Sequence, residues 1–391
     1  MKRLLAFIVV TIVAVSIGIA AAASYMDLGK QLAVSEEEQK KELVSKLAPV
    51  LMDELRNRIK VGLRIYKNGE LVYYNPNDPI SYEWMKLIVN YLFGCIGMGC
   101  AYTITATDGM TLLGLETMYG TPYNPQPAIA IGNGTTPASP EDYRLERQIA
   151  VYKLYSEDVV VNDTGTSYDI YFRHVFTFQE SINVSEAGLL LYARVLGSDT
   201  KYYWKYILIA RDTFSPITVS AGEAIAVEYV VSVDYSSPPF TREFWKVLVD
   251  YFLGLGGIGL GLGVSLDFGV DETDTYDLIR ESIYVAYILE PITWSPDITN
   301  ENVTNISAMW RPRMWVPELT PTSIIMKGFV IQGHVGPVYT VYGIAIYLCT
   351  DTDPSGGVNK DYVLIAVIPF DQPVTVDWST GFSIELGLSF A

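Results

Sequence analysis

The sequence is poor in the residues that most enzymes use for proton transfer, metal binding and nucleophilic attack. It has only 2 His and 3 Cys in 391 residues, and neither His174 nor His334 stands in a nucleophile or metalloprotease motif. These five side chains do not fall at recognised zinc spacings. We therefore expect no catalytic residue, no cofactor and no hydrolytic or redox site, and we interpret both histidines as structural.

The few cysteines allow at most one disulfide. Cys95 and Cys100 are close in sequence and either form a bridge or are packed thiols in an apolar, glycine-rich run, while Cys349 is left alone. A glycine pattern of the dinucleotide-binding type, Gly254 to Gly259, follows an expected helix instead of a strand, so we do not interpret it as a nucleotide site.

Positive charge is also scarce. Lys plus Arg is 27 against 44 Asp plus Glu, which gives a formal net charge of −17. Such a surface repels nucleic acid and anionic lipid, so no nucleic-acid partner is expected. What the chain does have is apolar and aromatic residues: half of it is hydrophobic and 28 residues are Tyr. Tyr-rich composition is common in β-rich extracellular proteins and in subunit interfaces.

The N-terminus is typical of an exported protein. Met1, Lys2 and Arg3 precede an uncharged run, residues 4–23, that ends in small residues. Residues 1–23 are thus a signal peptide or a retained membrane anchor. We expect an extracellular or cell-surface location.

Residues 24–79 are expected to form a stalk helix followed by a β-hairpin. A capping box at Ser35 opens a charged helix with an apolar residue every fourth position up to Ile59, and Pro49 predicts a kink in it. The alternation on either side of Asn68-Gly69 predicts a hairpin. The helix either stands free, pairs with another copy, or packs on the domain that follows.

The most informative feature is an internal repeat. Residues 83–99 (EWMKLIVNYLFGCIGMG) recur as residues 243–259 (EFWKVLVDYFLGLGGIG) with seven identities at a constant offset of 160. Large apolar residues fall on one helical face in both copies, and Gly94 and Gly254 should end the two helices.

Strand-like segments repeat as well. Gly188–Tyr192 matches Gly343–Tyr347, and Tyr206–Ala210 matches Tyr362–Ala366, at offsets of 155 and 156. The matches continue to the C-terminus, where Glu228 aligns with Glu385. We predict a mainly β protein of two tandem β-sandwich modules, residues 80–235 and 240–391, each opened by a short helix. The short Pro-rich linker between them predicts a fairly fixed angle.

Turn residues divide the first module into its strands. The expected strands are near Tyr102–Ala106, Ala128–Ile131, Ile149–Tyr155, Tyr168–Phe178, Ala187–Val195, Tyr203–Arg211 and Glu223–Asp234. Alternation in the fourth of these is imperfect, which predicts a bulge or a strand that is buried on both faces.

Two kinds of surface site are candidates. A Ca²⁺ loop is suggested by the oxygen-bearing residues Asp351, Asp353, Ser355 and Asp361, which equally make a plain turn. A second acidic patch comprises Asp271, Glu272, Asp274 and Asp277. Glycan acceptor sequons in expected loops or loop edges are Asn133, Asn162, Asn183, Asn302 and Asn305.

The order of elements in residues 61–234 resembles a module of phage-tail and virion structural proteins and of archaeal-type extracellular filament subunits. The segments that carry this resemblance are the Lys67–Glu70 hairpin turn, the helix ending at Gly94, Ile129–Pro137, Tyr143–Leu145, Ser185–Leu189 and Pro216–Val219. The resemblance implies a shared fold more than a shared activity.

Together these features favour a secreted, non-enzymatic structural protein, a self-assembling subunit of a pilus-like filament or surface layer. The alternatives are a virion structural protein and a carbohydrate-binding adhesin, in which Trp294, Trp310 and Trp315 would stack on sugars or else cover the core. We expect the segment Ser24–Tyr74 to join one subunit to the next, or else its hairpin to pair within its own module.

Overall fold

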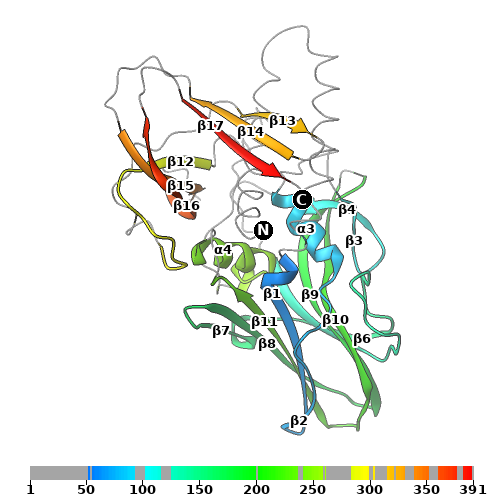
Figure 1. Cartoon of the computed structure of the whole chain (residues 1–391). Coiled ribbons are helices and arrows are strands. Elements are labelled where there is room, and N and C mark those ends of the chain that lie inside the picture. Colours follow the sequence, from blue (N-terminus) through cyan, green and yellow to red (C-terminus); the bar gives the residue numbers. More distant parts are fainter. Residues whose placement is uncertain are drawn as a thin grey trace.

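The computed structural model describes a mainly β protein built from antiparallel sheets (Figure 1). The residues it describes are 52, 55–92, 102–115, 125–199, 201–236, 241–258, 260, 283–298, 303, 315–320, 323–330, 339–351, 360–376 and 382–389.

Five strands form one sheet, called sheet A. They are β1 (Ile59–Lys67), β2 (Glu70–Asn75), β7 (Val159–Asp163), β8 (Ser167–Thr177) and β11 (Ala224–Asp234), in the order β2-β1-β11-β8-β7. The predicted hairpin is confirmed: Asn68 and Gly69 connect β1 and β2 with φ of 51° and 85°. Positive φ at both turn positions is what a tight hairpin needs, and Asn-Gly tolerates it.

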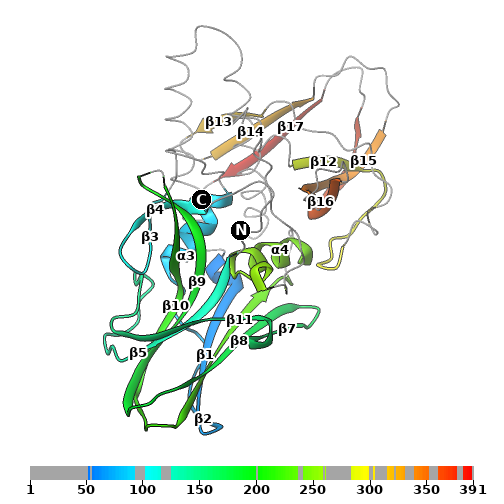
Figure 2. The ribbon, with the colours of Figure 1, turned by 180° about the vertical axis from the view of Figure 1, so that it is seen from behind.

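Sheet B faces sheet A. It contains β3 (Ile104–Thr105), β4 (Thr111–Leu115), β5 (Gln126–Gly132), β6 (Gln148–Lys153), β9 (Ile182–Gly197) and β10 (Tyr202–Val219). The order is β3-β4-β9-β5-β6, and β10 pairs with the other edge of β9. β9 and β10 form one long hairpin that runs the length of this half of the molecule (Figure 2).

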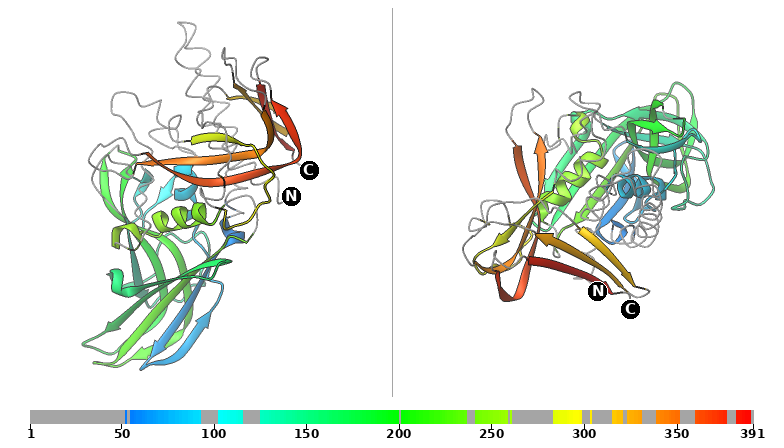
Figure 3. Two further views of the ribbon diagram at one scale, coloured as in Figure 1. Left: turned by 90° about the vertical axis from the view of Figure 1, so that its left-hand side faces the viewer. Right: turned by 90° about the horizontal axis from the view of Figure 1, so that it is seen from above.

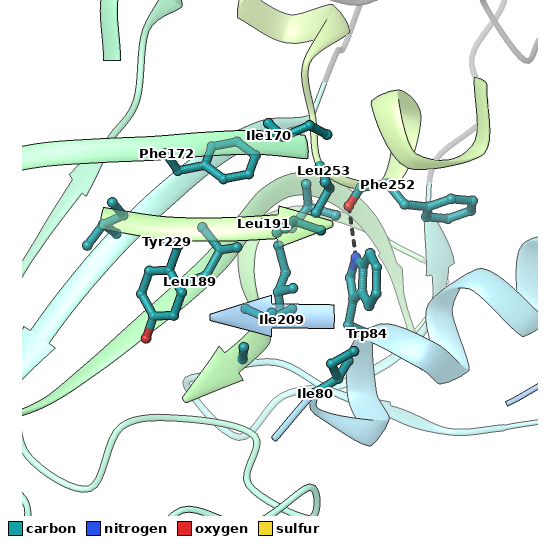
Figure 4. Close-up of a cluster of buried hydrophobic side chains, with 14 of the residues drawn as sticks. Ile80, Trp84, Ile170, Phe172, Leu189, Leu191, Ile209, Tyr229, Phe252 and Leu253 are labelled. Carbon is teal, nitrogen blue, oxygen red and sulfur yellow. Dashed lines mark hydrogen bonds between the residues drawn. The ribbon is translucent and has the colours of Figure 1, made fainter. Parts of the chain in front are cut away.

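The main hydrophobic core lies between the two sheets. Strand residues that alternate along β1 and β8, such as Val61, Leu63 and Phe172, meet Leu189 and Ile209 from sheet B, all at 0–1% exposure (Figure 4). Alternating burial follows from the two-residue period of a strand with one face in the core. A small second cluster, which includes Leu145 and Leu208, covers the outer face of sheet B.

Both predicted helices are present. α3 (Tyr82–Leu92) and α4 (Arg242–Phe252) carry their apolar faces into the same core, through Trp84 and through Leu248 and Phe252. α4 ends as predicted, because Gly254 follows the C-cap with φ of 77°. Gly94 lies outside the described residues. Two short 3₁₀ turns are η1 (Ser156–Asp158) and η2 (Gly256–Ile258).

The second half contains two three-stranded sheets. One has the order β12-β15-β16, formed by β12 (Ile283–Ile288), β15 (Tyr339–Asp351) and β16 (Lys360–Val376). The other has the order β13-β14-β17, formed by β13 (Trp315–Thr320), β14 (Ser323–Val330) and β17 (Phe382–Ser389). A separate core contains Ala286, Ala345 and Val367.

α4 joins the two halves (Figure 3). On one side the Tyr168 hydroxyl of β8 donates to the Asp250 carboxylate of α4 at 3.0 Å. On the same side Arg242 and Lys246 of α4 form salt bridges with Asp163 of β7. On the other side the Thr241 hydroxyl donates to the Leu364 carbonyl oxygen of β16 at 2.7 Å. Because α4 is hydrogen-bonded to both halves, it restricts their motion relative to each other. The short linker predicts the same restriction.

The segment before the first module differs from expectation. The predicted helix ends earlier than Ile59, because residues 55–58 are helical and Ile59 begins β1. Leu55 is 1% exposed and belongs to the main core, so this helix end packs on the domain. Residues 35–51 lie outside the described residues.

The hairpin is also part of the domain. β1 pairs with β11 over nine residues, Ile59 to Lys67, and buries Ile59, Val61, Leu63 and Ile65. Of the two alternatives for the hairpin, joining a neighbouring subunit or pairing within its own module, the structure shows the second. The alternating apolar side chains of β1 are buried in the core of their own chain.

Strand boundaries in the first half were partly mispredicted. β4 and β7 are not among the expected strands, and β9 and β10 are longer than expected, so that Pro216–Val219 is the end of β10. β8 shows no register shift with either neighbour. Its alternation is regular because His174 takes an inward position, whereas Val175 points outward and is 49% exposed.

Candidate functional site

A buried polar centre lies around two adjacent residues of β10, Arg211 and Asp212. Their exposed fractions are 2% and 6%, and as neighbours on a strand they point to opposite faces of sheet B. The start of α3 reaches the same place, because Ile80 bridges to Ala210 and the Ser81 N–H donates to the Ile209 carbonyl at 2.8 Å.

On the outer face, Arg211 pairs with a completely buried carboxylate, Glu186 of β9. Arg211 Nε lies 3.0 Å from Glu186 Oε2, and Arg211 Nη1 lies 2.7 Å from Asp142 Oδ2. The third guanidinium nitrogen donates to the Thr136 carbonyl at 3.1 Å. We call Glu186, Arg211 and Asp142 the charged latch. Burying these charges is tolerable because each is met by an opposite charge and by hydrogen bonds.

The charged latch fixes the loop of residues 133–147 on sheet B. Glu186 accepts backbone N–H groups of Gly134, Glu146 and Arg147 at 2.7–2.9 Å. The loop in turn places Leu145, 3% exposed, over Gly188. A Cβ at Gly188 would lie 2.5 Å from Leu145 Cδ1, so glycine there lets the Leu145 side chain approach the sheet closely.

The outer end of the loop is held by a second carboxylate. Glu146 Oε2 accepts the N–H groups of Thr135 and Thr136 at 2.8 and 2.9 Å. These backbone hydrogen bonds lower the pKa of Glu146 to about 2. Glu146 therefore accepts these hydrogen bonds as a carboxylate over most of the pH range.

On the inner face, Asp212 meets the end of the β1–β2 hairpin. Its Oδ2 accepts the Tyr73 hydroxyl at 2.7 Å and the Asn75 amide at 3.0 Å, and its Oδ1 accepts the Thr213 N–H at 2.7 Å. Asp78, 5% exposed, lies close enough for the charge of Asp212 to act on it. We call Asp78 and Asp212 the acid pair.

Asp78 has an unusual environment. No N–H or O–H group of the described residues donates to either of its carboxyl oxygens. Burial, and then the charge of Asp212, raise the pKa of Asp78 to about 9. Burial likewise raises the pKa of Tyr229, which is fully buried, well above its ordinary value.

This centre offers structure more than chemistry. Glu186, Arg211, Asp78 and Asp212 are between 0% and 6% exposed, so a substrate would reach none of them without movement of the 133–147 loop or the hairpin. The charged groups of this centre are carboxylates and one guanidinium, and the Ser81 hydroxyl beside them donates to the Asp142 carbonyl at 2.8 Å. The arrangement suits holding segments together.

A second candidate is a shallow groove of about 610 Å³ beside β7 and β8 of sheet A. Arg64 and Arg173 flank Glu228 at 3.0 and 3.9 Å there. His174 also lines the groove. Its ring stacks on Tyr152 at a centroid distance of 3.5 Å, and its Nδ1 lies 3.6 Å from Asp158. Burial, only partly offset by Asp158, lowers the pKa of His174.

The residues singled out in the sequence do not converge in one place. Asp351 ends β15 opposite Lys360, and Asp361 stands in β16 opposite Thr350, while Asp353 and Ser355 lie outside the described residues. Among the described residues, no cluster of three or more His, Cys, Asp or Glu is placed to hold a metal ion. Also outside the description are Asp271, Glu272, Asp274, Asp277, Cys95, Cys100, His334, Asn302, Asn305 and Trp310.

The described sequons lie in a loop and near the ends of two strands. Asn133 is exposed in the loop held by the charged latch, whereas Asn162 stands in β7 and Asn183 in β9. These last two stand one residue from the end of their strands, at loop edges, and both side chains are exposed. Trp294 packs against the second core, as the structural interpretation expects. Trp315 and Cys349 lie in β13 and β15.

Sequence reasoning missed the polar centre. A signal was present in the sequence. Glu186 stands directly before the apolar run Ala187–Leu191, and Arg211 and Asp212 directly follow a second apolar run that ends at Ala210. Charges next to buried strands need partners. Which charges pair depends on the strand register, and the sequence alone does not supply that register.

Comparison with known proteins gave no match among family models, curated proteins or solved structures. No helix in the described part of the chain is long and apolar enough to cross a bilayer, and residues 4–23 lie outside that part.

Proposed function

We propose that this protein is a secreted, non-enzymatic structural subunit that assembles with copies of itself into an extracellular filament or surface layer. The observation that carries the proposal is the open edge of sheet A at β2. Leu71, Val72 and Tyr74 on this short strand are 54%, 46% and 54% exposed. An unpaired edge strand with apolar side chains is a template for adding another strand.

The position of β2 favours such an addition. β2 is the last strand of sheet A, and it lies at the end of the molecule far from α3 and α4 (Figures 1 and 2). A neighbour would therefore be added to this edge without displacing a strand. In this proposal the N-terminal run, residues 1–23, exports the chain or anchors it in the membrane. A virion structural protein would use the same edge in the same way.

The non-enzymatic part of the proposal rests on the kind of charged groups in the interior. The acids and the arginine of the polar centre are enclosed and hold loop, hairpin and helix together. His174, the one histidine in the described residues, is engaged with Tyr152 and Asp158.

We further propose that the chain is two copies of one β-sandwich module. Three strand pairs of the first half, β5–β9, β9–β10 and β8–β11, have counterparts in β12–β15, β15–β16 and β14–β17, and β7–β8 corresponds to β13–β14. The strands occur in the same order along the chain, and all of these pairs are antiparallel.

Details inside the strands support the duplication. The ladder skips Ile209 in β10 and Ile365 in β16, and these two residues are aligned by the offset of 156. Glu228 stands opposite Arg173, and the aligned Glu385 stands opposite Lys327. The register of β15–β16 is displaced by two residues from that of β9–β10 under this alignment. A two-residue shift keeps each side chain on its face.

Substitution at the open edge tests the assembly proposal. Val72→Lys places a charge on β2, and Val160→Lys places the same charge on β7, the opposite edge of sheet A, where Val160 is 63% exposed. We expect Val72→Lys to abolish filaments or sheets in negative-stain microscopy and sedimentation, whereas Val160→Lys retains them. Circular dichroism checks that both variants are folded. Normal assembly of Val72→Lys would show that β2 is not the contact.

An adhesin is a second candidate because of an aromatic row on the outer face of sheet B. Trp204 and Tyr202 are 41% and 45% exposed, Trp204 stacks on Tyr192 at 5.0 Å, and Lys153 lies 3.4 Å from the centre of the Tyr192 ring. Aromatic rings of this kind stack on sugars. Retention on polysaccharide columns that is lost in Trp204→Ala and kept in Tyr155→Ala, an exposed control, would support it.

A further inference from the structure

We propose that Asp78 and Asp212 share one proton, and that this proton is a pH-sensitive clasp holding the β1–β2 hairpin and the start of α3 against β10. The geometry of the acid pair carries the proposal. It does not depend on the assembly proposed above, because it concerns contacts within one chain.

The two carboxyl groups of the acid pair differ in the number of hydrogen bonds that they accept. Asp212 receives three hydrogen bonds, from the Tyr73 hydroxyl, the Asn75 amide and the Thr213 N–H, which suit an ionised carboxylate. Asp78 receives none from the described residues, yet its oxygens are enclosed. A buried carboxylate without a donor is costly, so Asp78 is stable there when it is protonated and donates its proton to Asp212.

The groups that face Asp78 come from four strands. β1 contributes the Val61 carbonyl, which accepts the Asp78 N–H at 2.7 Å, and β2 contributes Tyr73. β11 contributes Tyr229, and β10 contributes Asp212. The guanidinium of Arg211 is engaged with Glu186 and Asp142 on the other face of sheet B. Two phenols and the Asn75 amide therefore lie around the acid pair, and a proton is the charge that balances it.

The clasp joins the segment of residues 73–78 to Asp212, which is more than 130 residues away in sequence. Tyr73 and Asn75 end β2, Asp78 lies in the connection to α3, and Asp212 follows the irregular part of β10. Removing the proton would leave two anions side by side in a buried place. Their repulsion would push Asp78 outward, and with it the connection that positions β2 and α3.

The direction of the pH effect follows from linkage. The pKa of Asp78 is about 9 in the folded protein against an ordinary value of 3.8, so between these values the folded chain holds a proton that the unfolded chain has lost. The contribution of the acid pair to stability is therefore present at acid pH and lost as the pH rises toward about 9. This pH dependence is opposite to that of an aspartate in an ion pair, whose contribution to stability is lost as the pH falls.

Thermal unfolding of the full chain from pH 4 to pH 9 tests the clasp. Asp78→Asn cannot ionise but can still donate an amide N–H to Asp212. We expect its melting temperature at pH 8 to exceed that of the wild type by about 4 °C or more, with a flatter pH dependence. Asp212→Asn removes the neighbouring charge and should also flatten the curve. Asp169→Asn on β8, away from the acid pair, should keep the wild-type curve.

Infrared spectroscopy gives a second readout that does not require a variant to fold. At pH 7 the wild-type protein should show the carbonyl stretch of an un-ionised carboxylic acid, and folded Asp78→Asn should lack it. Absence of this band from the wild type would overturn the proposal. So would a lower melting temperature of Asp78→Asn at pH 8 combined with destabilisation of the wild type by EDTA, because the acid pair would then hold a cation.

Discussion

The two long hairpins of the chain, β9–β10 and β15–β16, bury different kinds of side chain at positions that align in sequence. The alignment that matches Gly188 with Gly343 and Ala210 with Ala366 places Val341 at the position of Glu186 and Val367 at that of Arg211. Both valines are 0% exposed. Where the first half buries a salt bridge on its long hairpin, the second half buries two apolar side chains.

This difference shows what the buried charges are for. A buried ion pair is often no more stabilising than apolar residues of similar volume. The hairpin frame therefore does not need Glu186 and Arg211. The loop of residues 133–147 does, because three of its N–H groups and the Thr136 carbonyl end on this pair. The buried salt bridge between Glu186 and Arg211 thus occurs where the loop of residues 133–147 is fixed on the sheet.

Converting the first half toward the second is the strongest test of that view. Arg211→Val should lower the free energy of unfolding by about 3–5 kcal/mol, because it leaves Glu186 buried without its cation. The double variant Glu186→Val/Arg211→Val should lose less than the sum of the two single changes, with a coupling of at least about 1 kcal/mol. Urea denaturation measures all four forms. Additive losses would mean that the two residues act independently.

The helices offer a second conversion. Trp84 is fully buried and its Nε1 donates to the Phe252 carbonyl at 2.8 Å, which ties α3 to the end of α4, whereas the aligned residue of α4 is Phe244 (Figure 4). Trp84→Phe removes this bond and part of the ring volume. We expect a loss of about 2–3 kcal/mol by denaturant unfolding. A loss below about 0.5 kcal/mol would show that the tie is incidental.

The end of α4 tests how tightly the first half receives it. Gly254 has a φ of +77°, and a Cβ there would lie 2.7 Å from the Pro125 carbonyl oxygen. Gly254→Ala should therefore cost about 2 kcal/mol, from backbone strain together with the contact. Gly69→Ala is the matched control, since its φ is +85° but nothing lies within 4 Å of a new Cβ. Equal losses in the two variants would exclude a role of Pro125.

The smallest effect is expected at the ionic contact between the halves. Burial acts to raise the pKa of Asp163, but hydrogen bonds from Lys246, Tyr235 and Arg242 outweigh it and hold this pKa well below its ordinary value. The stabilisation is thus present above the ordinary pKa and lost as the pH falls below it. Asp163→Asn should cost about 1 kcal/mol at pH 7, and its difference from the wild type should shrink below pH 4. A difference that persists unchanged at pH 2 would contradict this.

Local patterns were enough for much of the fold. Asn68-Gly69 specified the hairpin, and the apolar spacing around Trp84 and Phe244 specified both helices, because these signals lie within a few residues of each other. β7 was missed because burial alternates along it, so that Val160, an apolar residue, points outward. The length of β9 was underestimated because residues 184–191 are buried on both faces of the strand. The second covering layer comes from the distant 133–147 loop, which a local pattern does not reveal.

The polar centre could not be predicted for a related reason. Asp78, Glu186 and Arg211 are more than 20 residues apart in sequence and meet only through strand pairing. Their types indicate that each needs a partner, but the partners follow from the register of β9 with β10 and from the bridge between Ile80 and Ala210.

The adjacency of Arg211 and Asp212 has a consequence for how the long hairpin forms. In the observed register the arginine faces Glu186 and the aspartate faces Tyr73 and Asn75. A slip of β10 by one residue would turn the aspartate toward Glu186 and the arginine into the apolar interior. Two anions would then be opposed and a cation stranded, so misaligned hairpins would be strongly disfavoured. A pair of neighbouring, oppositely charged residues thus favours the correct alignment of β9 with β10.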